Sequence, residues 1–188
     1  MVLSIVNPRW RPDRPGADLA PAPRRPVSPY PNNALIQEAT IYRVLDRLER
    51  GTEDYETEIR DFAESQPELT DYLTNDDTEA FTEDERGLLL FAALVIFQAV
   101  DDERSGVPEA SGEAIAKAEE HNYEVFGQTR GGTFRDRLTP FFEESEEEEL
   151  LAFVEDLVLA EEEEEGSISG EAREPFFVTL KTVIDVLT

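Results

Sequence analysis

The strongest pattern in the chain is a run of apolar residues near its middle. Residues 88–100 contain a single polar side chain, Gln98. The run is too short to cross a bilayer as a helix, which takes about 20 apolar residues, and it is apolar all round, so other protein must cover it. Thr82 and Glu85 have the spacing of a capping box at its start. A buried β-strand is the alternative, but the length and the cap favour a buried central helix over residues 82–103.

Apolar residues on both sides of this run recur every three or four positions, as on one face of a helix. Residues suited to the first turn or the N-cap precede several of these segments: Pro67, Ser111, Thr133 with Asp136, and Ser145 with Glu148. The apolar stripes include Ile41, Leu45 and Leu48; Tyr55, Ile59 and Phe62; Leu69, Tyr72 and Leu73; Ile115, Val125 and Phe126; Leu138 and Phe141; Leu150, Val154 and Leu157; and Phe176, Leu180 and Ile184. The pattern predicts an all-α fold, an irregular or orthogonal bundle of six to eight helices around the central one.

The first 32 residues have a different composition. They contain eight of the twelve prolines, and five arginines against two aspartates give them a charge of +3, which leaves −30 on the rest of a chain whose total is −27. Proline at this density prevents a regular helix and favours extended backbone. We predict an extended Pro/Arg-rich N-terminal arm over residues 1–32, packed on an acidic face of the bundle or of a second subunit, and an all-helical domain over residues 33–188.

The chain is strongly acidic, with 44 Asp and Glu against 17 Lys and Arg, and only Lys117 and Lys181 are lysines. Such a charge strains the compact state by self-repulsion and repels nucleic acid, so no direct nucleic-acid binding is expected. Abundant carboxylates with scarce lysine are typical of salt-adapted organisms, in which the acidity is an adaptation to the solvent. The functional alternative is an acidic nucleic-acid mimic that occupies a basic groove on a partner.

Counting residues argues against most catalytic and metal chemistry. The chain has no cysteine, and His121 is its only histidine, so thiolate sites, Ser-His-Asp triads and His-rich metal sites are not expected. The acidic runs lack the regular Asp/Asn/Gly spacing of a calcium loop. No catalytic residue, metal or cofactor is therefore predicted. The N-terminal sequence has no long apolar stretch of the signal-peptide kind, and we expect a cytoplasmic protein that binds no membrane.

One basic cluster stands out in the predicted helical part. Arg130, Arg135 and Arg137 surround Gly131 and Gly132 just before a predicted helix start. Glycines there can expose backbone N–H groups, and arginine can bind an anion through two parallel hydrogen bonds. The three arginines are thus a candidate anion-binding site, although ion pairs with the many carboxylates are the simpler interpretation.

We therefore expect a non-catalytic helical module for protein–protein interaction or assembly, whose partner is another protein or another copy of the chain. The alternatives are an enzyme or small-anion-binding protein that uses Arg130, Arg135 and Arg137, and the acidic mimic.

The charge generates a prediction about salt. Raising potassium chloride from 0.1 M to 1 M shortens the range of the repulsion from about 10 Å to about 3 Å, so the melting temperature should rise. Calorimetry in chloride and in sulfate at equal ionic strength separates screening from the extra apolar burial that sulfate favours. A melting temperature that stays flat or falls in chloride would contradict the expectation.

Overall fold

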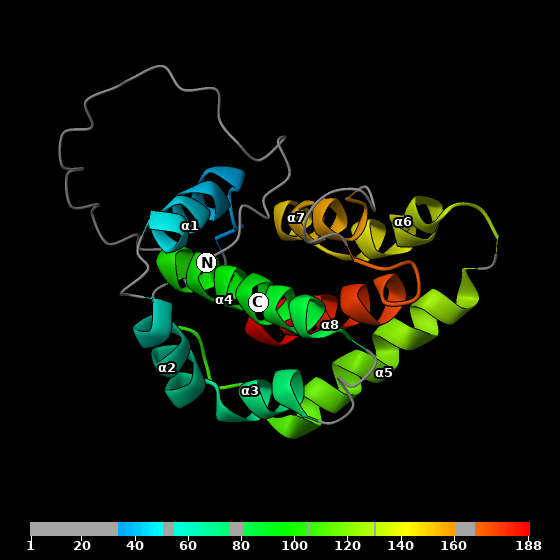
Figure 1. Cartoon of the computed structure of the whole chain (residues 1–188). Coiled ribbons are helices and arrows are strands. Elements are labelled where there is room, and N and C mark those ends of the chain that lie inside the picture. The colour runs from blue at the N-terminus through cyan, green and yellow to red at the C-terminus, as the bar shows by residue number, and fades with distance from the viewer. Residues whose placement is uncertain (1–33, 51–54, 76–80, 105, 130, 161–167) are drawn as a thin grey trace, which may run out of the picture.

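The described part of the chain is entirely helical. The computed structural model describes residues 34–50, 55–75, 81–104, 106–129, 131–160 and 168–188, and over these ranges it contains eight helices and no strand (Figure 1), which confirms the all-α class. The helices are α1 Glu38–Arg50, α2 Tyr55–Ser65, α3 Pro67–Thr74, α4 Glu83–Arg104, α5 Gly112–Gln128, α6 Phe134–Glu144, α7 Glu148–Val158 and α8 Arg173–Leu187. The arm predicted over residues 1–32 and the candidate residue Arg130 lie outside these ranges.

Helix α4 corresponds to the predicted central helix. Between Leu88 and Val100 every residue is buried except Leu90 and Phe97, which are partly buried and pack against the core. The capping box at its start is present: the Thr82 N–H donates to Glu85 Oε2 at 2.8 Å, and the Glu85 N–H donates to Thr82 Oγ1 at 3.2 Å. Because this helix carries apolar side chains on all sides, it is most stable when other helices cover it.

The C-terminal helix α8 is as central as α4, which the sequence did not reveal. Its apolar residues predicted one buried stripe, yet every residue from Phe176 to Ile184 is buried, among them Lys181 and Thr182. Helix α8 packs against α4, α5 and α7. It therefore shares the middle of the fold with α4, and its polar residues are buried because neighbouring helices cover them as well.

The remaining helices surround this pair (Figure 1). Helices α1, α6 and α7 lie on one side of α4 in the figure, and α2, α3 and α5 lie on the other. Helix α1 packs on α4 and α7, and α3 packs on α2, α4 and α5. The last of these contacts, between α3 and α5, forms the cleft described below.

Several predicted helix starts are confirmed and one is wrong. The side chains of Ser111 and Thr133 cap α5 and α6, and Pro67 occupies the first turn of α3. Ser145 does not cap α7, which begins three residues later at Glu148 after Glu147 as the N-cap residue. The Glu147 side chain does not cap the helix either, because it turns inward to accept hydrogen bonds from other segments.

Gln98, the one polar residue in the central run, is buried and finds hydrogen-bond partners, as expected. Its side chain is 6% exposed, its Nε2 donates to Glu58 Oε2 at 2.6 Å, and its Oε1 accepts from Arg47 Nη2 at 2.8 Å. An unpaired buried amide would cost about 1–3 kcal/mol. The pairing instead lets this amide join α4 to α1 and α2.

A buried ion pair closes one end of the molecule. Arg104, the last residue of α4, pairs with Glu147, and the two side chains are 8% and 6% exposed. Arg104 also donates to the main-chain oxygens of Ala34 and Thr188, and Glu147 accepts from the Ile36 N–H at 2.9 Å. Four segments of the chain meet at these two side chains.

At the other end of α4, Glu85 ties the start of α4 to the segment that leads into α8. Besides its bond from Thr82, this buried carboxylate accepts from the Ser169 N–H at 2.9 Å and from Ser169 Oγ at 2.8 Å. Burial alone would raise the pKa of Glu85, but the hydrogen bonds from Thr82 and Ser169 outweigh it, so the pKa lies below its ordinary value of 4.5.

The buried ion pair can be tested against an exposed one. Glu147→Gln leaves the Arg104 charge uncompensated and should lower the free energy of unfolding by about 3 kcal/mol, the lower end of the cost of breaking a buried pair. Asp46→Asn breaks the pair with Arg50, whose side chains are 54% and 71% exposed, and should cost less than about 1 kcal/mol. Denaturant unfolding of both variants measures the difference, and equal losses would contradict the assignment.

Candidate functional site

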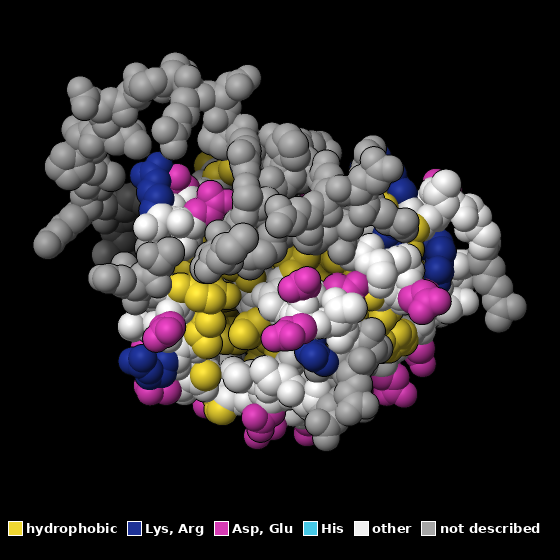
Figure 2. All heavy atoms as spheres, viewed as in Figure 1, with side chains coloured by type: hydrophobic (Ala, Val, Ile, Leu, Met, Phe, Trp, Pro, Cys, Tyr) yellow, Lys and Arg dark blue, Asp and Glu magenta, His cyan; other side chains and the backbone are white. Residues whose placement is uncertain are grey.

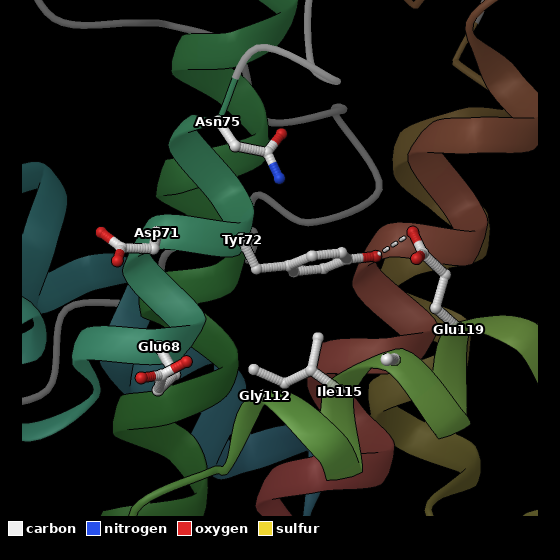
Figure 3. Close-up of a pocket in the computed structure, with 8 residues that line it drawn as sticks. Glu68, Asp71, Tyr72, Asn75, Gly112, Ile115 and Glu119 are labelled. Carbon is white, nitrogen blue, oxygen red and sulfur yellow. Dashed lines mark hydrogen bonds between the residues drawn. The ribbon is translucent and has the colours of Figure 1, made fainter.

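A shallow cleft lies between α3 and α5. Its volume is about 280 Å³, and the residues that line it are Glu68, Asp71, Tyr72, Asn75, Gly112, Ile115, Ala116 and Glu119. Figure 3 shows α3 as one wall and α5 as the other, with the Tyr72 ring reaching across between them. This volume is near the lower end of the range of about 300–1,000 Å³ for ligand pockets, so the cleft suits a side chain rather than a large molecule.

The position of α3 relative to α5 is fixed by Gln66, the buried residue that precedes α3. Its Nε2 donates to the Pro108 carbonyl at 3.0 Å, and its Oε1 accepts from the Ala110 N–H at 2.9 Å. Both partners belong to the loop that leads from α4 to α5. A fully buried amide with both ends bonded in this way holds the two walls of the cleft in one register.

Tyr72 and Glu119 form the polar contact across the cleft. The Tyr72 hydroxyl donates to Glu119 Oε1 at 2.7 Å, the dashed line in Figure 3. Burial raises the pKa of Tyr72, and the Glu119 carboxylate raises it further, while the Thr179 and Thr182 hydroxyls oppose the shift. Tyr72 therefore remains a neutral donor, and the Glu119 carboxylate keeps one oxygen without a partner among the described hydrogen bonds.

Glu68 belongs to α3, and its carboxylate lies against the first residue of α5. A Cβ added to Gly112, the first residue of α5, would lie 2.9 Å from Glu68 Oε2, so any larger residue would push the carboxylate aside. A carboxylate at a helix N-terminus gains from the helix dipole by about 0.3–1 kcal/mol. Asp71 lies one turn along α3 and points to the outer side of that helix in Figure 3.

The wall formed by α5 is anchored on the central helix α8. Asn122, which is 1% exposed, donates through Nδ2 to Thr182 Oγ1 at 3.2 Å and to Asp185 Oδ2 at 2.9 Å. Asp185 also pairs with Lys181. One turn before Asn122 on the same helix, Glu119 thus projects from a rigid support.

The acidic groups of the cleft have no basic counterpart in the described structure. No lysine or arginine lines it, and no described basic side chain forms an ion pair with Glu68, Asp71 or Glu119. Tyr123 follows Glu119 by one helical turn and is 43% exposed, one of two large apolar or aromatic side chains in the described ranges with such exposure. The cleft therefore combines uncompensated negative charge with aromatic surface.

The two described arginines of the predicted cluster, Arg135 and Arg137, form ion pairs. Arg135 donates through Nε to Glu155 Oε1 at 3.0 Å, and Arg137 donates to Glu174 Oε2 at 2.8 Å while its guanidinium lies 4.4 Å from the centre of the Phe126 ring. Both described arginines have a carboxylate partner, which was the simpler interpretation of the cluster.

The helix start beside these arginines is also occupied. Asp136 accepts from the Thr133 N–H at 2.7 Å, and the Asp136 N–H donates to Thr133 Oγ1. Asp136 Oδ2 also accepts from Thr133 Oγ1 at 2.8 Å, and the two bonds that Thr133 donates to this carboxylate lower the pKa of Asp136. An anion at this position would meet a carboxylate and would have to displace two more, those of Glu155 and Glu174.

The other sequence candidates take ordinary structural places. His121 is 60% exposed and lies 3.5 Å from a Glu144 oxygen, as a helical histidine beside carboxylates. No group of three or more His, Cys, Asp or Glu in the described ranges is arranged to hold a metal ion. None of the described helices has the length and apolar character that crossing a membrane requires.

Acidic side chains are spread over one face of the molecule. On the face in Figure 2 the Asp and Glu side chains are scattered between apolar and neutral groups rather than aligned along one ridge. Regular spacing along a ridge would be needed to imitate the phosphates of a nucleic acid, which follow one another at fixed intervals.

Comparisons of the chain with models of protein families, with curated proteins and with solved structures found no match.

The cleft was not predicted from the sequence. Tyr72 was assigned to an apolar stripe, and Glu68 and Glu119 were not distinguished from the other acidic residues. The available signals were a glycine at the start of a helix, which permits a close approach, and a glutamine directly before Pro67. Neither signal says which two helices meet.

The Tyr72 contact predicts a titration. Because the pKa of Tyr72 is raised above its ordinary value of 10.0, its stabilising bond to Glu119 is fully present below pH 10 and is lost as the pH rises through the folded pKa. Among the five tyrosines of the chain, Tyr72 should be among the last to ionise in the ultraviolet absorbance of tyrosinate. Tyr72→Phe should remove the phase at highest pH, and loss of an early phase instead would contradict the assignment.

Proposed function

We propose that the protein is a non-catalytic interaction module that binds a basic segment of a protein partner, with the cleft between α3 and α5 receiving an arginine or lysine side chain. The observation that carries the proposal is the cleft itself: its lining includes Glu68 on α3 and Glu119 on α5, and no described basic residue lines it. Carboxylates without a basic neighbour attract a cationic group, and this supports the binding of a basic side chain.

The aromatic surface suits the same ligand. A guanidinium or ammonium group that enters between Glu68 and Glu119 lies beside the ring of Tyr72, and a cation near an aromatic face is attracted to it. Ile115 and Ala116 complete the lining and can contact the apolar stem of a long basic side chain. The exposed Tyr123 extends the surface along α5, and tyrosine is common at the centre of interfaces.

The magnitudes favour a peptide or protein over a free small molecule. Contacts with exposed carboxylates contribute about 0.2–1 kcal/mol each and a cation–π contact about 0.5–1, so one side chain between the two glutamates gains at most about 3 kcal/mol, equivalent to a Kd of several millimolar. Useful affinity requires several contacts. A segment with repeated basic residues would obtain them from the acidic groups around the cleft, such as Asp71 at its rim.

A peptide-binding experiment tests the proposal. The probe is a fluorescein-labelled peptide with three arginines spaced by prolines, and its control carries glutamine in place of arginine. Fluorescence anisotropy at low ionic strength should show that the full chain binds the arginine peptide only. In the Glu68→Gln/Glu119→Gln variant binding should weaken about two- to tenfold, because two charge contacts are lost while the hydrogen-bonding capacity remains.

The matched control removes the same charge elsewhere on α5. Glu120 and Glu124 are exposed and do not line the cleft, so Glu120→Gln/Glu124→Gln should bind the probe as the wild type does. Equal weakening in both double variants would mean that the peptide is held by general charge attraction, and the cleft would then have no special role. A circular dichroism melting curve of each variant checks that the fold is intact.

A further inference from the structure

We infer that the chain carries its own occupant for this cleft: the arginines near the N-terminus, Arg9, Arg11 and Arg14, bind intramolecularly between α3 and α5 and compete there with a partner. The inference rests on the proposed function and names a ligand within the same molecule. It makes residues 1–33 a built-in competitor rather than a passive extension.

Charge and composition select this segment as the occupant. Residues 1–32 carry five of the fifteen arginines and a charge of +3, in a chain whose remaining residues carry −30. Arg9 and Arg11 flank Trp10, the only tryptophan, so the segment offers cations and an aromatic ring to a cleft that contains carboxylates and a tyrosine. Prolines at positions 8, 12 and 15 restrict its backbone, which reduces the entropy lost on binding.

The start of the described chain, Ala34, lies close enough to the cleft for the preceding residues to reach it. The Ala34 carbonyl accepts a hydrogen bond from Arg104 Nε at 3.2 Å, and Gly112, in the lining of the cleft, follows Arg104 by eight residues. Eight extended residues span at most about 30 Å, so Ala34 lies within roughly 40 Å of the cleft. Arg14 precedes Ala34 by twenty residues, which span about 60 Å in a proline-rich conformation. The three arginines can therefore reach the cleft with length to spare.

Because the N-terminal segment is tethered to the cleft, the chain's own segment should occupy it in preference to the segment of a second copy. A segment joined to its site by a short linker acts at an effective concentration of the order of millimolar. A second copy matches that only when the protein itself is millimolar, so at ordinary concentrations the intramolecular contact prevails. Because single cation contacts in the cleft have affinities of several millimolar, the segment is held in a readily reversible way that a stronger basic partner can displace.

Trp10 provides a direct readout in the full chain. Acrylamide quenching of its fluorescence should be weaker in the native protein than in the unfolded chain. Glu68→Gln/Glu119→Gln should weaken docking about two- to tenfold and raise the quenching accordingly, whereas Glu120→Gln/Glu124→Gln should leave it unchanged. The quenching should also be independent of protein concentration from about 1 to about 100 μM, well below the effective concentration of the tethered segment.

Competition gives the second readout. Arg9→Gln/Arg11→Gln should bind the arginine probe more tightly than the wild type, because the internal competitor is weakened. The control Arg60→Gln/Arg86→Gln changes the net charge equally at two exposed helical positions, and it should change probe binding less.

The outcomes separate the two proposals. If the probe binds through the cleft but the cleft variant leaves Trp10 quenching unchanged, the segment docks elsewhere and the inference fails alone. Protection of Trp10 that rises with protein concentration would overturn the intramolecular contact in favour of a second copy. If the probe does not distinguish the cleft variant from its control, the proposed function has failed and the inference fails with it.

Discussion

The joint burial of α4 and α8 is the constraint on which the rest of the fold depends. Each helix is buried around most of its circumference, so neither can lie on the surface of a small domain, and the other described helices must cover them. Because the chain is so strongly charged, its stability depends on this core. A chain with formal charge −27 gains little from its long-range electrostatics, and apolar burial has to supply the stabilisation.

Polar groups in this interior fix geometry rather than add apolar stabilisation. Gln98 joins α4 to α1 and α2, Glu85 joins the start of α4 to the approach to α8, and Arg104 with Glu147 joins four segments at the other end of α4. Each of these groups is costly to bury alone and harmless when paired. The pairs therefore penalise alternative packings, in which one partner would be left without the other.

The small number of basic residues explains the uncompensated negative charge of the cleft. Described arginines such as Arg43, Arg104 and Arg137 pair with carboxylates near the core or between helices, and the chain has only 17 basic residues for 44 acidic ones. Carboxylates at the junction of α3 and α5 consequently have no described basic partner. The proposed cationic segment, from another protein or from the chain's own N-terminus, would supply the positive charge that the described helices lack at this cleft.

The sequence determined the elements whose signals are local. An apolar run interrupted only by Gln98 defined α4. The hydroxyl groups of Thr82, Ser111 and Thr133 marked three helix starts, because capping bonds span only a few residues. Only the tertiary structure decided the rest. Ser145 ends α6 instead of capping α7. Arg135 and Arg137 found partners on other helices, and α8 became central through its neighbours. The cleft exists because Gln66 and the loop before α5 hold two helices together from positions more than forty residues apart. Periodicity reports which face of a helix is buried, but it carries no information about which other helix will cover it.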